Sequence, residues 1–245
     1  MAETTLGLIL LSGGMDSTTA AAWALNGGMK VSAISFNYGQ AHRRELKSAR
    51  EVARRLGLKH NVVDVSFYRE LAAYSSLTSP EAMALPTGRD TTDMPKDIPS
   101  TYVPMRNTFF MTMAAAWLES EALSTIENDG ILPDELSATL IIAANAIDYS
   151  GYPDCRPEFY NAIAESLRLG SKLGTQYGVP FSIATPLLEL SKAEIIKLAI
   201  DLEAPLDATW SCYDAKDTPC GICDACLLRA KGFEDVNVED PALPK

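Results

Sequence analysis

The sequence predicts an α/β protein built on a doubly wound, mostly parallel sheet. Short apolar runs rich in Val and Ile alternate with stretches of helical periodicity along the 245 residues, and this alternation is typical of strands joined by crossover helices. A Gly-rich turn follows the first apolar run directly. In sheets of this kind, the first such turn is where a nucleotide phosphate binds.

Strands and helices alternate in the expected order. We expect strands over residues 6–11, 30–36, 61–65, 139–143 and 181–184, and helices over residues 17–25, 41–56, 105–122, 157–169 and 191–202. The first helix ends at Asn26-Gly27-Gly28, because Gly ends a helix without steric conflict. The last begins with a capping box in which Ser191 and Glu194 satisfy free backbone N–H groups. The first three strands form a mononucleotide-binding half of the sheet.

Three segments interrupt this alternation. Residues 74–102 are dense in Ser, Thr, Pro and Asp and too long for a plain connector, so they form either a mobile lid over a substrate or a surface insertion. Residues 126–135 are expected to be a polar surface insertion. We therefore divide the chain into a nucleotide- and substrate-binding domain (1–205), a small metal-binding region (206–233) and a loose acidic tail (234–245).

The overall charge excludes some functions. Asp and Glu number 32 against 21 Lys and Arg, a formal net charge of −11, which disfavours non-specific binding to nucleic acid. No apolar run approaches the roughly 18 residues of a membrane span, and the start lacks the basic region of a signal peptide. We expect a cytoplasmic protein that acts on a small molecule, without direct contact to nucleic acid or membrane.

The loop after the first strand has the composition of an anion site. It consists of Ser12, Gly13, Gly14, Met15, Asp16 and Ser17. Glycines let backbone N–H groups approach a ligand, and the following helix favours a negative charge at its start. The loop lacks the Lys of a Walker loop and does not match the dinucleotide fingerprint. A plain strand-to-helix turn is the alternative to a phosphate or pyrophosphate site.

Four of the five cysteines are grouped near the C-terminal end, which indicates a metal. Cys212, Cys220, Cys223 and Cys226 have the spacing C-x7-C-x2-C-x2-C. Four thiolates form a closed tetrahedral site, so we expect structural Zn²⁺. An iron–sulfur cluster or free thiols are the alternatives. The segments 209–211 and 227–229 would fix this region to the sheet domain.

The motif SGGMDS resembles the pyrophosphate loop of the ATP pyrophosphatases, which include GMP, NAD and asparagine synthetases. The resemblance implies a Rossmann-like, adenine nucleotide alpha hydrolase-like fold. It also implies that ATP is cleaved between its α and β phosphates to give an adenylylated substrate and pyrophosphate. Asp16 would then lie near Mg²⁺, because two adjacent anions need a bridging cation.

Further motifs resemble a narrower family. They are YGQAH at 38–42, PSTYVPMRN at 99–107, DYSGYPDCR at 148–156 and TPL at 185–187 followed by Lys192. With SGGMDS and the cysteines, they are similar to the 7-cyano-7-deazaguanine synthases, the QueC family of queuosine and 7-deazapurine biosynthesis. The resemblance implies that 7-carboxy-7-deazaguanine and ammonia are converted to the nitrile through an adenylylated acid and an adenylylated amide. Related enzymes also indicate a homodimer.

The resemblance assigns roles to particular residues. Asp148 and Asp154 would accept hydrogen bonds from a guanine-like edge, and Tyr149 and Tyr152 would stack on the base. Tyr38, Gln40 and Asn107 would also bind substrate. Arg106 and Arg156 would pair with a carboxylate or phosphate, although each has an alternative role in a surface ion pair. Cys155 is expected to be a buried thiol and not a nucleophile.

Acid–base and phosphate-binding groups complete the expected site. Lys192 would face a phosphate, with a solvated surface lysine as the alternative. His42 and Glu45 fall early on one helix and would act as acid–base groups, while a capping or packing role suits His42 equally well.

Met105 departs from the family pattern, which usually has Gly before the Arg-Asn pair. Its bulk beside the substrate segment raises the alternative that an amine of a partner protein, and not ammonia, accepts the acyl group. The tRNA-thiolation class is disfavoured by the net charge of −11 and by the single cysteine outside the metal cluster. The intact loop also disfavours a nucleotide sensor without catalytic activity.

Overall fold

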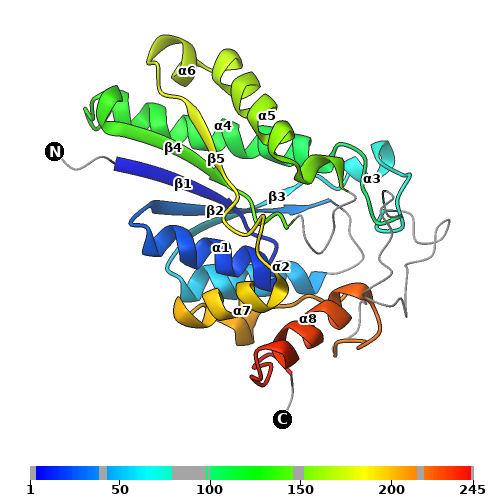
Figure 1. The fold of residues 1–245 in the computed structure, drawn as a ribbon. Coiled ribbons are helices and arrows are strands. Elements are labelled where there is room, and N and C mark those ends of the chain that lie inside the picture. Colours follow the sequence, from blue (N-terminus) through cyan, green and yellow to red (C-terminus); the bar gives the residue numbers. More distant parts are fainter. Residues whose placement is uncertain are drawn as a thin grey trace.

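Five parallel strands form one sheet in the order β3-β2-β1-β4-β5 (Figure 1). The computed structural model describes residues 4–38, 43–78, 98, 100–145, 152–213 and 218–243. The strands are β1 (Thr4–Leu10), β2 (Lys30–Asn37), β3 (Lys59–Asp64), β4 (Leu136–Ile141) and β5 (Phe181–Ala184). The predicted α/β fold with a doubly wound sheet is confirmed.

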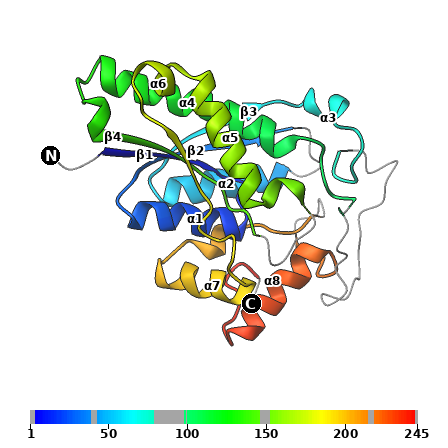
Figure 2. The ribbon, with the colours of Figure 1, turned by 45° about the horizontal axis from the view of Figure 1, so that its top comes forward.

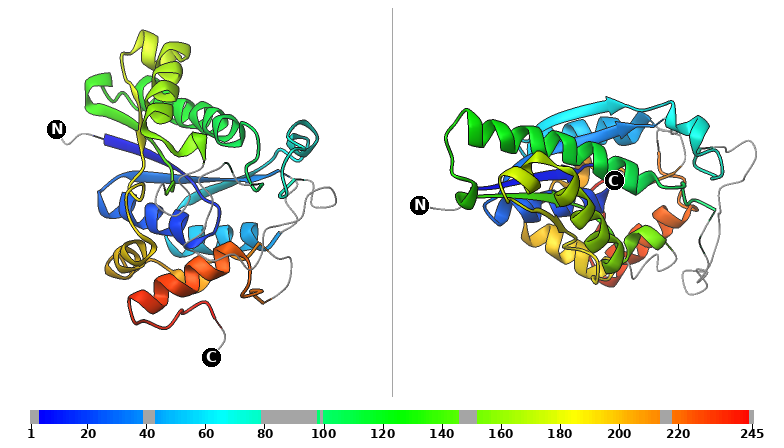
Figure 3. Two further views of the ribbon diagram at one scale, coloured as in Figure 1. Left: turned by 45° about the vertical axis from the view of Figure 1, so that its right-hand side comes forward. Right: turned by 90° about the horizontal axis from the view of Figure 1, so that it is seen from above.

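Helices cover both faces of this sheet. They are α1 (Met15–Asn26), α2 (Arg43–Arg55), α3 (Tyr68–Leu71), α4 (Arg106–Glu127), α5 (Pro157–Gly170), α6 (Lys172–Gln176), α7 (Lys192–Asp201) and α8 (Asp224–Asp235). Short 3-10 turns occur at Pro133–Glu135, Pro153–Cys155 and Leu206–Ala208. Figures 1 and 2 show α4, α5 and α6 on one face and α1, α2 and α7 on the other, with α8 alongside α7. Seen from above, α4 crosses the length of the sheet (Figure 3).

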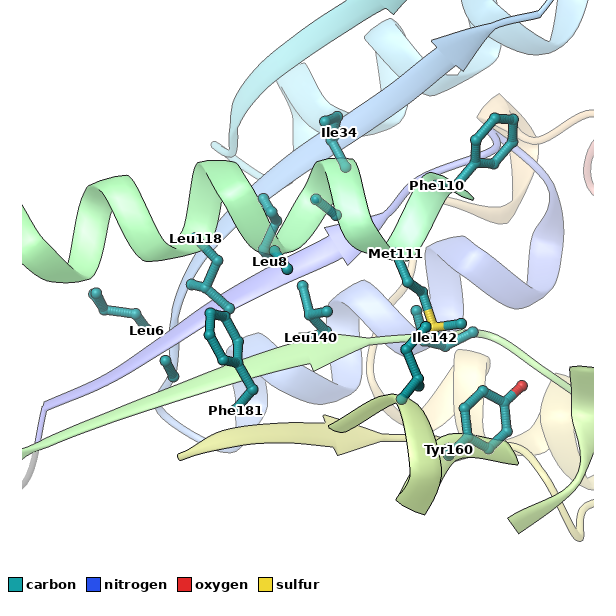
Figure 4. Close-up of a cluster of buried hydrophobic side chains, with 14 of the residues drawn as sticks. Leu6, Leu8, Ile34, Phe110, Met111, Leu118, Leu140, Ile142, Tyr160 and Phe181 are labelled. Atoms are coloured by element: carbon teal, nitrogen blue, oxygen red, sulfur yellow. The ribbon is translucent and has the colours of Figure 1, made fainter. Parts of the chain in front are cut away.

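Alternation along the strands separates two hydrophobic cores. Leu8 and Leu140 point toward α4, where they pack with Met111 and Leu118 (Figure 4). Their neighbours Ile9 and Ile141 point the other way, into the core that contains α1, α2 and α7. Successive side chains of a strand face opposite sides of the sheet, so a parallel sheet covered on both faces needs apolar residues at consecutive positions.

Two boundaries differ from the prediction by more than two residues. The long helix continues to Glu127, and β4 begins at Leu136, before the expected residue 139. The expected surface insertion at 126–135 is wrong in part, because Ile126 and Ile131 pack against the core below α4. Polar neighbours concealed these two apolar anchors in the sequence.

The C-terminal tail is not loose within the described residues. Arg229 of α8 forms a buried ion pair with Asp240, in which Nε donates to Oδ2 at 2.6 Å and Nη2 to Oδ1 at 2.9 Å. Asp240 also accepts the backbone N–H of Ala242 at 3.0 Å. An acidic segment was expected to remain in solvent, but this carboxylate neutralises a buried guanidinium.

The ends of β1 and β4 mark the functional edge of the sheet. From β1 the chain passes through α1 to β2 on one side of β1, whereas β4 and β5 lie on its other side. The strand order therefore reverses between β1 and β4. Ligands of open α/β sheets bind in the crevice at such a reversal. In the part of the chain that the structure describes, no helix is both long and apolar enough to span a membrane.

Candidate active site and metal centre

The loop between β1 and α1 is held in shape by its own side chains. Ser17 Oγ accepts the backbone N–H of Ser12 at 3.2 Å and donates to the carbonyl oxygen of Gly14 at 3.1 Å. Ser12 Oγ accepts the backbone N–H of Gly14 at 3.2 Å. Met15 is buried and packs beneath the loop against Ile196 of α7. The loop thus presents a rigid backbone at a helix N-terminus, which is a favourable site for an anion.

Gly13 lets α2 lie directly against this loop. Its φ is 86°, and a Cβ placed there would lie 2.4 Å from the carbonyl oxygen of Glu45 and 2.5 Å from the backbone nitrogen of Ala49. Real Cβ atoms do not approach other heavy atoms so closely, so any side chain would push the helix away. The first turn of α2 therefore forms one wall of the loop.

Asp16 and Lys192 meet at the loop, although they belong to α1 and α7. Lys192 Nζ lies 2.9 Å from Oδ2 and 3.1 Å from Oδ1 of Asp16. The stem of Lys192 is supported by α8, since a Cβ at Gly232 would lie 2.6 Å from Lys192 Cγ. The predicted phosphate loop and the predicted lysine are thus adjacent in the structure, and together they provide a carboxylate and an ammonium group.

A cavity of about 640 Å³ extends from this loop, within the usual size range of ligand pockets. The predicted site residues in its wall are Ser12, Gly14, Met15, Asp16, Ser17, Tyr38, Arg106, Asn107, Tyr152, Lys192 and, from the cysteine cluster, Cys220 and Cys223. Cys155 and Glu45 also line it. The loop and the candidate substrate residues therefore share one cavity.

Arg106 is the main cation on the substrate side of the cavity. It is the first residue of α4, and its Nε donates to Asn107 Oδ1 at 3.3 Å. It also forms a hydrogen bond with Tyr38. Burial raises the pKa of Tyr38, and the positive charge of Arg106 opposes that shift. A fixed cation in a partly enclosed site is suited to a carboxylate or a phosphate.

Asp154 lies near Arg106 in a buried position. The residue is 7% exposed, and Oδ1 has no hydrogen-bond partner among the described residues. Burial raises the pKa of Asp154, while the charge of Arg106 acts in the opposite direction. Tyr152, two residues earlier, exchanges a hydrogen bond of 2.7 Å with Thr101 Oγ1. Buried polar atoms normally have partners, so Oδ1 is suited to accept a donor, but Asp154 is not among the residues that line the cavity.

The remaining predicted residues are placed elsewhere or not described. Arg156 is exposed at the start of α5 and is not part of the cavity wall. Gln40, His42, Asp148 and Tyr149 lie outside the described residues. Met105 is 60% exposed with a φ of 56° and does not line the cavity, so its bulk lies outside the described wall. A Gly at this position would adopt the same backbone without steric conflict.

One part of the cavity wall comes from the segment that was expected to be a lid or a surface insertion. Ser76 and Leu77 line the cavity, and the backbone N–H of Ser76 donates to the carbonyl oxygen of Ser100 at 2.9 Å. This contact joins the two described ends of the segment expected as a lid or a surface insertion. The composition predicted the segment as a whole but did not single out Ser76 or Leu77, because their place in the wall depends on chain geometry and not on residue type. Residues 79–97 and 99 are outside the described part.

The four cysteines form one cluster. Their Sγ atoms all lie within 4.8 Å of one another, whereas a tetrahedral zinc site with bonds of about 2.3 Å has sulfur atoms about 3.8 Å apart. The backbone N–H of Cys220 points to Cys212 Sγ at 3.3 Å, and that of Cys223 to Cys220 Sγ at 3.4 Å. The cluster is therefore compatible with a metal such as zinc.

Trp210 and Arg229 connect this cluster to the sheet domain. Trp210 Nε1 donates to the carbonyl oxygen of Cys212 at 2.9 Å, and the Arg44 guanidinium lies 4.5 Å from the Trp210 ring centroid. Arg229 Nη1 donates to Thr209 Oγ1 at 2.8 Å and to Ser211 Oγ at 3.1 Å. The segment before the first cysteine is thus held on both sides of Trp210.

Comparison with known proteins agrees with these features. The family described as queuosine biosynthesis protein QueC matches residues 7–237. This chain belongs to the QueC family. The 7-cyano-7-deazaguanine synthase of Thermoplasma acidophilum is 43% identical and the match covers 96% of this chain and 90% of that protein. The synthase of Nostoc punctiforme is also 43% identical, with 96% and 97% covered. The predicted QueC family and synthase-type enzyme are confirmed.

Proposed function

We propose that this QueC protein uses ATP to convert 7-carboxy-7-deazaguanine and ammonia to 7-cyano-7-deazaguanine, a carbon–nitrogen ligase reaction. One observation carries the proposal: a single cavity is lined both by the loop expected to bind an anion and by Arg106, Tyr38 and Tyr152. A nucleotide and an aromatic acid can therefore occupy it together. The relatives are named 7-cyano-7-deazaguanine synthases, and the motifs that resemble this family imply that the acid is 7-carboxy-7-deazaguanine.

The reaction needs activation because a carboxylate is a poor electrophile. Its oxygen attacks the α phosphate of ATP, pyrophosphate leaves, and an acyl-adenylate forms. Ammonia then displaces AMP and gives the amide. A second adenylylation on the amide oxygen lets AMP depart as the nitrile forms. The protein contributes mainly orientation and charge stabilisation.

Each part of the cavity has a task in this proposal. Backbone N–H groups of residues 12–17 and Lys192 hold the pyrophosphate, since a helix N-terminus and an ammonium group both favour anions. Arg106 orients the substrate carboxylate. Tyr152 packs against the ring, and Asp154, two residues further on and outside the cavity wall itself, is proposed to accept a donor of the deazaguanine edge.

Mg²⁺ is the cation that ATP chemistry requires, and the donor set here suits it. Mg²⁺ in such sites is held by one or two carboxylates together with substrate phosphates. Asp16 supplies a carboxylate at the loop, next to Lys192. When bound there, Mg²⁺ would neutralise charge on the phosphates. At the four cysteines, Zn²⁺ would have a structural role, because four thiolates leave no position for water.

The direct test is a reaction with the purified protein, ATP, Mg²⁺, ammonium and 7-carboxy-7-deazaguanine. We expect two AMP and two pyrophosphate per nitrile. Asp16→Asn should abolish AMP release while zinc stays bound. If AMP forms only when a partner protein is added, and that protein gains the mass of the deazaguanine acyl group, then the acceptor is a protein amine and the proposal is wrong.

A further inference from the structure

Glu45 connects the phosphate loop with the substrate side of the cavity. It belongs to the first turn of α2, whose backbone is in contact with Gly13 of the phosphate loop. Its side chain lines the same cavity as Tyr38 and Arg106. Its backbone thus contacts the loop expected to hold phosphate, and its side chain is within electrostatic reach of Arg106, the cation expected to hold the substrate acid. In the proposed function, the bond between the acyl carbon and AMP is made and broken between this loop and Arg106.

The nitrogen source creates a chemical requirement at this place. In neutral water, ammonia is almost entirely ammonium, which has no lone pair and cannot attack a carbonyl carbon. A group in the cavity must bind the cation and accept one of its protons. A carboxylate can do both, because it attracts a positive charge and is a proton acceptor.

Few groups in the cavity wall meet this requirement. Among the described residues that line it, Asp16 and Glu45 are the carboxylates. Asp16 is already ion-paired with Lys192. Burial raises the pKa of the Cys155 thiol to about 11, so this group is occupied by its own proton at neutral pH. Of these two carboxylates in the described wall, Glu45 is therefore the one that is not ion-paired with Lys192.

The electrostatic surroundings of Glu45 suit proton transfer. Burial raises its pKa to about 7, and the positive charge of Arg106 limits the shift. A general base is most effective when its pKa lies near the working pH, because it is then deprotonated often enough and still accepts a proton. This agrees with the role that its position indicates.

We propose that Glu45 is a catalytic residue that binds ammonium in the cavity and removes its proton before ammonia attacks the adenylylated substrate. This rests on the proposed ligase function. A proton passes from ammonium to a Glu45 carboxylate oxygen. The freed nitrogen lone pair forms the C–N bond, and the C–O bond to AMP breaks with its electron pair on the leaving phosphate. The nitrogen then loses a second proton to water, and Glu45 returns its own proton to solvent.

The test separates activation of the acid from attack by nitrogen. Glu45→Gln keeps the shape of the side chain but removes its charge and its basicity. With ammonium, we expect amide formation to fall about 100-fold or more, because positioned acid–base groups contribute on that scale. ATP–pyrophosphate exchange that depends on the deazaguanine acid should stay within a few-fold of the unmodified protein. Glu51→Gln, on the exposed side of the same helix, is the matched control and should change neither rate.

Hydroxylamine supplies a second readout, because it is largely uncharged at neutral pH and needs no proton acceptor before attack. Glu45→Gln should form the hydroxamate at nearly the unmodified rate. Equal losses with ammonium and hydroxylamine would overturn the proposal, and so would full activity with both. Loss of exchange in Glu45→Gln alone would assign Glu45 to the ATP site instead. Absence of exchange in the unmodified protein would overturn the ligase function itself.

Discussion

The backbone N–H of Trp210 donates to the carbonyl oxygen of Gly13 at 2.9 Å. This hydrogen bond joins the phosphate loop to the segment that leads into the first cysteine of the metal cluster. The indole N–H of the same Trp210 donates to the carbonyl oxygen of Cys212 at 2.9 Å. One residue therefore connects the two functional regions, so the geometry of the cluster and that of the loop are mechanically linked.

Weakening this connection should affect nucleotide binding. Trp210→Phe keeps a buried ring but leaves the carbonyl oxygen of Cys212 without its indole donor, and such a loss costs about 1–3 kcal/mol. We expect the free energy of unfolding to fall by about 1–3 kcal/mol. We also expect the ATP KM to rise at least several-fold. The control is Trp117→Phe, because the Trp117 ring lies on α4 next to Lys59 and does not line the cavity. Equal effects of the two variants on the ATP KM would contradict the link.

The contact between Gly13 and α2 predicts a steric effect beyond backbone strain. Gly13 and Gly57 both have positive φ, 86° and 67°, but a Cβ at Gly57 would meet nothing within 4 Å. Gly57→Ala should therefore cost only about 1–2 kcal/mol of stability. Gly13→Ala should cost clearly more and abolish detectable AMP release, because Glu45 and the loop are forced apart. Denaturation curves and AMP assays on both variants measure the difference, and similar values for the pair would refute the close contact.

The ion pair of Arg229 and Asp240 should contribute much more stability than an exposed pair. Its side chains are only 9% and 5% exposed, and removing one partner of a buried pair costs about 3–5 kcal/mol. We expect Arg229→Met to lower the urea midpoint strongly. Arg168→Met breaks the exposed pair with Glu165, which is worth about 1 kcal/mol or less. If the two midpoints shift equally, the tail is not anchored as the structure describes.

Cys155 should react slowly with alkylating reagents in the folded protein. Burial raises the pKa of its thiol from 9.0 to about 11, so at pH 8 the thiolate fraction is about 100-fold lower than in the unfolded chain. The reaction rate should rise with pH up to about 11, because deprotonation supplies the nucleophile. Peptide mass spectrometry after iodoacetamide treatment, with and without guanidinium, measures the two rates. Equal rates would mean that Cys155 is an ordinary exposed thiol.

Local signals in the sequence were sufficient for much of the fold. The strand at Phe181–Ala184 agrees with its predicted range, and the capping box of Ser191 and Glu194 forms at the start of α7. Both depend on neighbouring residues alone. The helix α8 was not predicted, because Cys226 and Gly232 obscure the helical period. It packs against α7, with Gly232 close to Lys192 and Phe233 in one cluster with Ile196.

The candidate site was predictable by residue type but not by proximity. Asp16, Arg106 and Lys192 were chosen from separate motifs, and the structure brings all three to one cavity. Glu45 was recognisable as a polar residue early on a helix, yet its contact with the phosphate loop arises from the close approach at Gly13. Such contacts depend on the packing of α2 against the sheet, and no local pattern in the sequence encodes them.

The ion pair of Asp16 and Lys192 joins residues 176 positions apart, and β1 needs β4 as a neighbour on the sheet. A growing chain emerges from the ribosome with its N-terminal end first. The phosphate loop is therefore synthesised well before Lys192 and Trp210, which are its final partners. Even a nascent chain that already contains the whole sheet would hold this loop without Trp210, so nucleotide binding should begin only after Trp210 has emerged from the ribosome.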